Sequence, residues 1–168
     1  MGVKGTLRVV ESPPLSPTEI RYLKAVFKLG GCPGRGSYVK FSEIARLLGI
    51  SAPTVSIMVR RLEDRGLLEV KSRKGVALTW KGLELLAEHC WKIAVIEVVL
   101  AKLGVPEEYQ GELVEKILLA LDRNGVMRLW DCLGRPKTCP HGSPLDLDLT
   151  SLANVVEFLD KCCGLERS

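Results

Sequence analysis

Residues 41–82, FSEIARLLGISAPTVSIMVRRLEDRGLLEVKSRKGVALTWKG, contain the pattern that decides the fold. Apolar residues recur at helical spacing on both sides of Gly49, which predicts two helices joined by a tight turn. Ser42 and Ser51 stand where each helix is expected to begin, and a hydroxyl there can cap free backbone amides. A basic two-stranded hairpin follows the second helix, so the stretch predicts a winged helix-turn-helix.

The second helix and the hairpin carry residue types that meet nucleic acid. The N-terminal end of such a helix fits the major groove, where hydroxyls and arginines reach base edges and phosphates. The basic hairpin turn can reach a neighbouring phosphate or the minor groove. We therefore predict contacts with double-stranded DNA from Ser51, Pro53, Thr54, Ser56, Arg60, Arg61, Lys71, Arg73 and Lys74. The structural alternative makes Ser51 only a helix cap, and Arg60 and Arg61 only a solvated face.

The formal net charge of +4 conceals a division along the chain. Residues 1–80 carry 14 Lys and Arg against 6 Asp and Glu, whereas residues 81–168 carry 10 against 14. A basic first part suits a polyanionic partner, and an acidic second part suits protein contacts or a metal. Chance segregation of charge in a small protein is the alternative.

Helical patterns dominate the rest of the chain. Ser16 and Glu19 form a capping-box pattern ahead of a first helix. Thr79 begins a long helix that Gly104 ends, and Asn124-Gly125 predicts a break between two later helices. The helices expected after residue 104 span residues 106–123, 126–133 and 149–163.

Two domains follow from this reading. We predict a mostly α-helical protein, with a winged helix-turn-helix DNA-binding domain at residues 1–80 and a helical dimerisation or sensor domain at residues 81–168. Apolar runs such as those within residues 93–100 and 117–121 exceed what one small domain can bury. A homodimer interface is the expected place for them.

Composition argues against several other classes. The chain has no run of about 18 apolar residues and no signal-peptide pattern, so we expect a cytoplasmic protein without a membrane segment. We expect no enzyme, because the two histidines, His89 and His141, accompany neither a Gly-rich phosphate loop nor an evident nucleophile. Asn and Gln total only three residues, which is typical of thermophiles, where intracellular disulfides are tolerated.

The residues also resemble a known family, the metal-dependent repressors of the diphtheria toxin repressor type, which includes the manganese regulators. The resemblance covers roughly residues 16–145. It is carried by Thr18-Glu19, Tyr22-Leu23, Ser42-Glu43-Ile44-Ala45, Ser51-Ala52-Pro53-Thr54-Val55-Ser56, Leu62, Arg65-Gly66-Leu67, Leu78-Thr79, Gly82, Gly134-Arg135-Pro136 and Cys139-Pro140-His141-Gly142-Ser143-Pro144. It implies a transcription regulator, expected to be a repressor, that binds operator DNA as a homodimer.

The family further implies that Fe²⁺ or Mn²⁺ binds between the first helix and the helical domain. This chain departs from the family at those positions. Counting without gaps, the implied ligands are replaced by Arg21, Lys92, Ile96, Leu118 and Leu119. Only Glu115 keeps a ligand type, and cations or leucines cannot ligate a divalent metal. The usual site is therefore expected to be degenerate, with Glu97 and Asp122 as nearby surface carboxylates.

Two replacements for the metal are open. In the first, Arg21 or Lys92 pairs with Glu115 and mimics the bound ion. In the second, metal or redox sensing has moved to the cysteines, with Cys132, Cys139 and His141 as candidate ligands and the vicinal pair Cys162-Cys163 nearby. Structural thiols or disulfides are the alternative for these cysteines. A winged helix used only for protein interaction is a further alternative, which the basic wing argues against.

Overall fold

The computed structural model describes residues 14–33, 36–146 and 151–164. For residues 163 and 164 it describes the backbone alone. It is mostly helical, with one two-stranded antiparallel sheet. The elements in chain order are α1 Pro17–Lys28, α2 Phe41–Leu48, α3 Ala52–Asp64, β1 Leu68–Lys71, β2 Gly75–Leu78, α4 Trp80–Lys102, α5 Glu107–Ala120, α6 Arg123–Cys132 and α7 Leu152–Gly164. The predicted fold class is confirmed.

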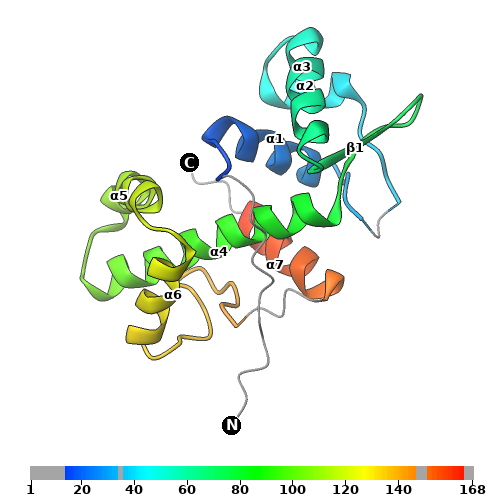
Figure 1. Ribbon diagram of the computed structural model, residues 1–168. Helices are drawn as coiled ribbons and strands as arrows, with labels where there is room; N and C mark the ends of the chain where they lie inside the picture. Colours follow the sequence, from blue (N-terminus) through cyan, green and yellow to red (C-terminus); the bar gives the residue numbers. More distant parts are fainter. Residues whose placement is uncertain (1–13, 34–35, 147–150, 165–168) are drawn as a thin grey trace.

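The long helix α4 runs through the middle of the molecule (Figure 1). At its N-terminal end it follows the hairpin and lies against α1, while α5 and α6 pack at its other end. Helix α7, from the end of the chain, returns to contact both α1 and α4. One cluster of buried apolar residues extends from Ile20 to Leu159, so the two predicted domains share a core.

Most predicted helix starts are confirmed. Ser16 and Glu19 form a reciprocal capping box at α1, and Ser51 and Thr79 cap α3 and α4. Ser42 is not a cap, because Lys40 takes that position and the Glu43 carboxylate accepts a 2.8 Å hydrogen bond from the Lys40 amide. The cap of α2, held by the Glu43 carboxylate, therefore lies earlier in the chain than the hydroxyl pattern suggested.

The predicted break at Asn124-Gly125 is wrong. Helix α5 ends at Ala120, and α6 begins at Arg123. The carboxylate of Asp122 caps α6 by accepting a 2.7 Å hydrogen bond from the Gly125 amide. Asp122 is thus a helix cap, and the Asn-Gly pair lies in the first turn of a helix.

The hairpin of β1 and β2 projects from the molecule at the right of Figure 1. Its strands pair from Leu68 with Leu78 to Lys71 with Gly75. Val39 bridges to Val76, so the segment before α2 adds to the edge of β2. Gly75 is required here, since a Cβ atom on it would lie 2.2 Å from the Val39 carbonyl oxygen.

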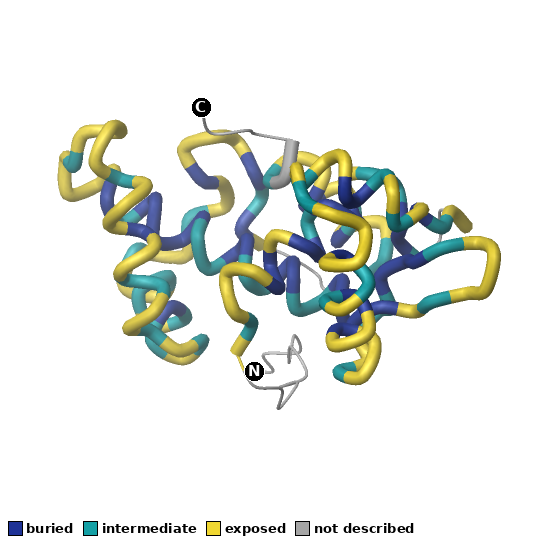
Figure 2. Tube along the Cα trace, turned by 90° about the horizontal axis from the view of Figure 1, so that it is seen from above, coloured by how far each residue is buried: buried dark blue, intermediate teal, exposed yellow. Residues whose placement is uncertain are grey.

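Burial is uneven along the molecule. Figure 2 shows the far ends mostly exposed and the buried positions concentrated where the helices meet. In α5 only Val114 is fully buried, and Leu119 and Tyr109 remain 82% and 59% exposed. No single helix of the described chain is long and apolar enough to cross a membrane; α2 and α3 meet that test only as a pair, bent by 110°.

Candidate nucleic-acid interface and a neighbouring pocket

Helix α3 has one buried and one exposed face. Val55, Val59 and Leu62 are fully buried against the rest of the winged fold. The opposite face is exposed from the N-terminus to the last turn, and it carries Pro53, Thr54, Ile57, Arg60 and Arg61. Because residues three and four apart share a helix face, these side chains form one continuous surface.

Ile57 was missed by the sequence reasoning. Its side chain is 72% exposed, at the centre of the exposed face, between Thr54 and Arg60. The signal was available, because Ile57 falls outside the stripe of Val55, Val59 and Leu62 at helical spacing. Ser56 is half-buried, so it lies at the edge of this surface rather than at its centre.

The hydroxyls at the start of α3 have a structural task. The Ser51 Oγ accepts a 3.3 Å hydrogen bond from the Thr54 amide, and the two hydroxyl oxygens lie 2.7 Å apart. Both residues are exposed. The cap therefore fixes the geometry of the exposed helix N-terminus while it leaves hydroxyl oxygens at the surface.

Arg60 and Arg61 differ in their surroundings. Arg60 is exposed and makes no ion pair within the described ranges. Arg61 turns toward α1, where its Nε lies 3.8 Å from the carboxylate of Glu19. Glu19 is only 2% exposed and also accepts a 2.6 Å hydrogen bond from Arg65. Burial raises the pKa of Glu19, but hydrogen bonds from Ser16 and Arg65 outweigh it and hold that pKa below its ordinary value.

The wing presents three cations around its turn. Lys71, Arg73 and Lys74 are exposed, and Arg73 adopts a positive φ of 63° at the tip. Lys71 lies 5.0 Å from the centre of the Tyr38 ring and 3.2 Å from the Glu69 carboxylate, which also accepts a hydrogen bond from the Tyr38 hydroxyl. This contact orients Lys71, while the other two cations face solvent.

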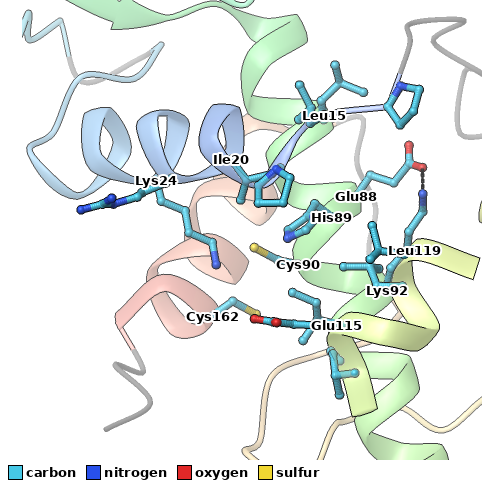
Figure 3. Close-up of a pocket in the computed structure, with 18 of the residues that line it drawn as sticks. Leu15, Ile20, Lys24, Glu88, His89, Cys90, Lys92, Glu115, Leu119 and Cys162 are labelled. Atoms are coloured by element: carbon cyan, nitrogen blue, oxygen red, sulfur yellow. Dashed lines mark ion pairs between the residues drawn. The ribbon is translucent and has the colours of Figure 1, made fainter. Parts of the chain in front are cut away.

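A cavity of about 1450 Å³ opens between α1, α4, α5 and α7. Figure 3 shows its walls: Lys24 extends from α1 toward His89 and Cys90 of α4, with Glu115 and Leu119 contributed by α5. Lys92 and Glu88 of α4 form an ion pair of 3.2 Å at the cavity wall. Desolvation by burial, with the positive charges of Lys24 and Lys92, lowers the pKa of His89 from 6.5 to about 4.

The cavity lies where the family resemblance implies a metal, but its side chains do not fit Fe²⁺ or Mn²⁺. Five of the positions that the resemblance implies line it, namely Arg21, Lys92, Glu115, Leu118 and Leu119, and only Glu115 among them is a carboxylate. The carboxylates of Glu88, Glu97 and Asp122 also line the cavity. Within the described ranges no group of three or more His, Cys, Asp or Glu side chains is placed to hold a metal ion. Hard divalent cations need several oxygen or nitrogen donors.

Ile96 and Glu97 correct the residue count along α4. Ile96 does not line the cavity and is fully buried in a separate apolar cluster with Leu100 and Val114. Glu97 lines the cavity and is 3% exposed, so the expectation of a surface carboxylate was wrong. Its oxygen lies 3.5 Å from His141 Nδ1, and this histidine anchors the loop after α6.

The ion pair of Arg21 or Lys92 with Glu115, one of the two replacements for the metal left open by the sequence, does not form. Lys92 pairs with Glu88, and Arg21 donates a 2.8 Å hydrogen bond to the Leu48 carbonyl at the end of α2. Neither cation is within 4 Å of Glu115 in the described chain. Glu115 is exposed on α5.

The cysteine candidates are dispersed. Cys132 is exposed at the end of α6, whereas Cys139 is buried in the following loop and accepts a hydrogen bond from the Ser143 amide. Cys32 and Cys90 are buried, and Cys162 is half-buried. The side chain of Cys163 lies outside the described residues, so the vicinal pair stays a prediction.

Comparisons with known proteins agree with this geometry. Residues 15–76 match the family model described as iron dependent repressor, N-terminal DNA binding domain. Residues 79–146 match the model described as iron dependent repressor, metal binding and dimerisation domain. An uncharacterized HTH-type transcriptional regulator of Aeropyrum pernix is 39% identical over 146 residues, which covers 87% of this chain and 81% of that protein.

Solved structures also resemble this chain. A hypothetical protein from Sulfolobus solfataricus superposes with a TM-score of 0.70 at 28% identity, covering 79% of this chain and 100% of the other. The structure of ScaR with bound Zn²⁺ superposes with a TM-score of 0.66 at 31% identity, covering 79% of this chain and 61% of ScaR. This chain therefore spans less than two-thirds of the length of ScaR.

Proposed function

Because the chain belongs to the iron-dependent repressor family, we propose that it regulates transcription by binding operator DNA as a homodimer, through the exposed face of α3 and the wing. The observation that supports these contacts most directly is the continuous exposed face of α3 with Arg60 unpaired by any described carboxylate. The exposed cations of the wing extend this surface. A helix with this arrangement places its N-terminal half in the major groove.

We assign separate tasks to the predicted contact residues. Ser51, Pro53, Thr54 and Ser56 position the start of α3 against phosphate and base edges, with Ile57 added as an apolar contact to thymine methyl groups. Arg60, Arg61, Arg73 and Lys74 supply charge toward phosphates. Lys71 also supplies charge toward phosphates, and its contact with Tyr38 fixes the direction of its side chain. Regulation of this kind involves no catalysis. It takes place in the cytoplasm, where the protein meets the genome.

We further propose that Fe²⁺ and Mn²⁺ do not control this binding. The side chains at the family's ligand positions support this view, since Glu115 is accompanied there by Arg21, Lys92, Leu118 and Leu119. The other acids of the cavity do not change this, because no three or more His, Cys, Asp or Glu side chains of the described residues are grouped to hold a metal ion. Metal sensing through Cys132, Cys139 and His141 is a weaker candidate, because the described side chains do not form a metal-binding group. We likewise propose that the two domains divide at residue 80 and that two copies of the chain pair through the helical domain.

The test is DNA binding measured by fluorescence anisotropy with a labelled duplex. We expect affinity to fall as salt rises, because phosphate contacts release counterions. Arg60→Ala should weaken binding and reduce the salt slope by about 0.9 for the lost phosphate contact. Lys116→Ala is the matched control, since Lys116 is exposed on α5 and far along the chain from the wing. Absence of binding at low salt would refute the proposal.

Addition of metal provides the second measurement. Mn²⁺ or Fe²⁺, added to protein first treated with a chelator, should leave the affinity unchanged. A metal-dependent gain in affinity that disappears in Glu115→Gln would show instead that the family site operates.

A further inference from the structure

Helix α7 brings the end of the chain back into the middle of the molecule (Figure 1). It contacts α1, which belongs to the winged part of the protein (α1 to β2), and α4, which begins the helical part. The second family model matches residues 79–146, whereas α7 spans residues 152–164. The matched domains therefore do not account for this helix.

The contact that α7 makes is apolar and closely packed. Val155, Phe158 and Leu159 are fully buried, and their spacing of three and four residues places them on one face of the helix. They belong to the same apolar cluster as Ile20 of α1 and Leu86 of α4. Because burial of large apolar side chains is favourable, this face holds α7 against both parts of the protein.

The two parts also touch directly, since α1 contacts α4. Next to this contact lies the cavity of about 1450 Å³, which α1 borders together with α4 and α5. Close packing resists the tilting of one element against another, and the side chains around a cavity lack those packing contacts. Helix α7 lies at this cavity through Cys162, and Figure 3 shows it below α1 and beside α4. It therefore supplies packed contacts beside a region where α1 has few.

The orientation of the winged part matters for a dimer that reads two half-sites. Such a dimer needs a fixed distance between its two recognition helices. If the winged part samples several orientations on α4, the pair of α3 helices has the right spacing for only a fraction of the time, and the affinity for the full site falls by that fraction. Binding of one winged part to one half-site does not depend on this spacing.

We propose that α7 is a clamp that fixes the winged part on the helical part and thereby sets the spacing of the two α3 helices in the dimer. Phe158 is the positioning residue at its centre, because it is the largest of the fully buried side chains in the described chain. This role rests on the proposed function, since it requires a dimer that binds DNA.

The experiment measures the affinity of the full chain for two duplexes by fluorescence anisotropy at low salt. The first duplex is the palindrome that the wild-type chain selects from a random library, and the second keeps one half of that sequence with the other half scrambled. Phe158→Ala leaves a cavity in the contact of α7, so its affinity for the full palindrome should fall about tenfold or more. Its affinity for the half-site should change by less than about twofold, because spacing is not involved.

Asn154→Ala is the matched control, since Asn154 is exposed on the same helix, and it should bind both duplexes like the wild type. Phe158→Leu keeps a smaller apolar side chain and should show a weaker loss of the same kind. It provides the same comparison if circular dichroism shows that Phe158→Ala is unfolded.

Equal losses for the two duplexes would overturn the proposal, because they would mean that α7 only supports the fold of the winged part. Wild-type affinity of the folded Phe158 variants for the full palindrome would overturn it as well. Either result, with a wild-type chain that binds DNA, leaves the proposed function standing. A wild-type chain that bound neither duplex would instead refute the proposed function.

Discussion

The buried carboxylate of Glu19 in α1 accepts a hydrogen bond of 2.6 Å from the guanidinium of Arg65, the residue that ends α3. The same carboxylate caps α1 through Ser16 and lies 3.8 Å from Arg61. One acidic group thus holds the end of the candidate recognition helix against the first helix. The orientation of α3 depends on this contact.

Replacing Glu19 with glutamine should therefore affect both stability and binding. Glu19→Gln leaves Arg65 without its charged acceptor, and we expect a loss of about 2 kcal/mol in the free energy of unfolding. The pKa of Glu19 is lowered in the folded protein, so its contribution is present above the ordinary value of 4.5 and lost as the pH falls through the lowered pKa. Urea titrations at pH 7 and pH 3 measure both effects. Stability losses equal at both pH values would contradict this account.

The capping box that positions Glu19 was readable from the sequence, and so was the order of helices, because these features depend on residues three or four apart. The distant partners of Glu19 were not readable. Arg65 lies 46 residues away, and no local pattern places a side chain beside another so remote. The same limit applies to the cavity, where a count along α4 assigned Ile96 to the site and left Glu97 at the surface. A one-residue error on a helix rotates a position by about 100°. Here that rotation separates Ile96, which packs with Leu100 and Val114, from Glu97, which lines the cavity.

Ile57 should contribute to sequence preference rather than to stability. Its side chain is 72% exposed, so Ile57→Ala should change the free energy of unfolding by less than about 0.5 kcal/mol. Apolar contact with a thymine methyl group distinguishes thymine from other bases in the major groove. Selection from a random duplex library should give a preferred thymine that Ile57→Ala loses and that Lys116→Ala retains. An unchanged selected sequence would show that Ile57 does not contact bases.

His89 predicts a second and separate pH dependence of stability. Burial and the nearby Lys24 and Lys92 lower its folded pKa from 6.5 to about 4, so the unfolded chain binds a proton more readily. Stability should therefore decrease as the pH is lowered from about 6.5 to about 4, because unfolding takes up a proton in this window. His89→Asn should remove that part of the slope and leave the Glu19 effect below it. Thermal denaturation at half-unit pH steps tests this, and an unchanged slope in His89→Asn would assign it to other groups.

Gly75 offers a test of how the wing is held. It has a φ of 121°, and a Cβ atom at this position would lie 2.2 Å from the Val39 carbonyl oxygen. Gly75→Ala combines a disfavoured backbone conformation with a backbone clash, so we expect a loss of about 2 kcal/mol or more and weaker DNA binding, as the hairpin moves from the Val39 segment. Gly111→Ala is the matched control, because Gly111 lies inside α5 with nothing within 4 Å of its added Cβ. That substitution should stabilise the protein by about 0.5–1 kcal/mol, since alanine favours a helix interior over glycine. Denaturant titration of both variants decides the matter: a Gly75→Ala protein as stable as the wild type would mean that the wing does not depend on close approach to Val39.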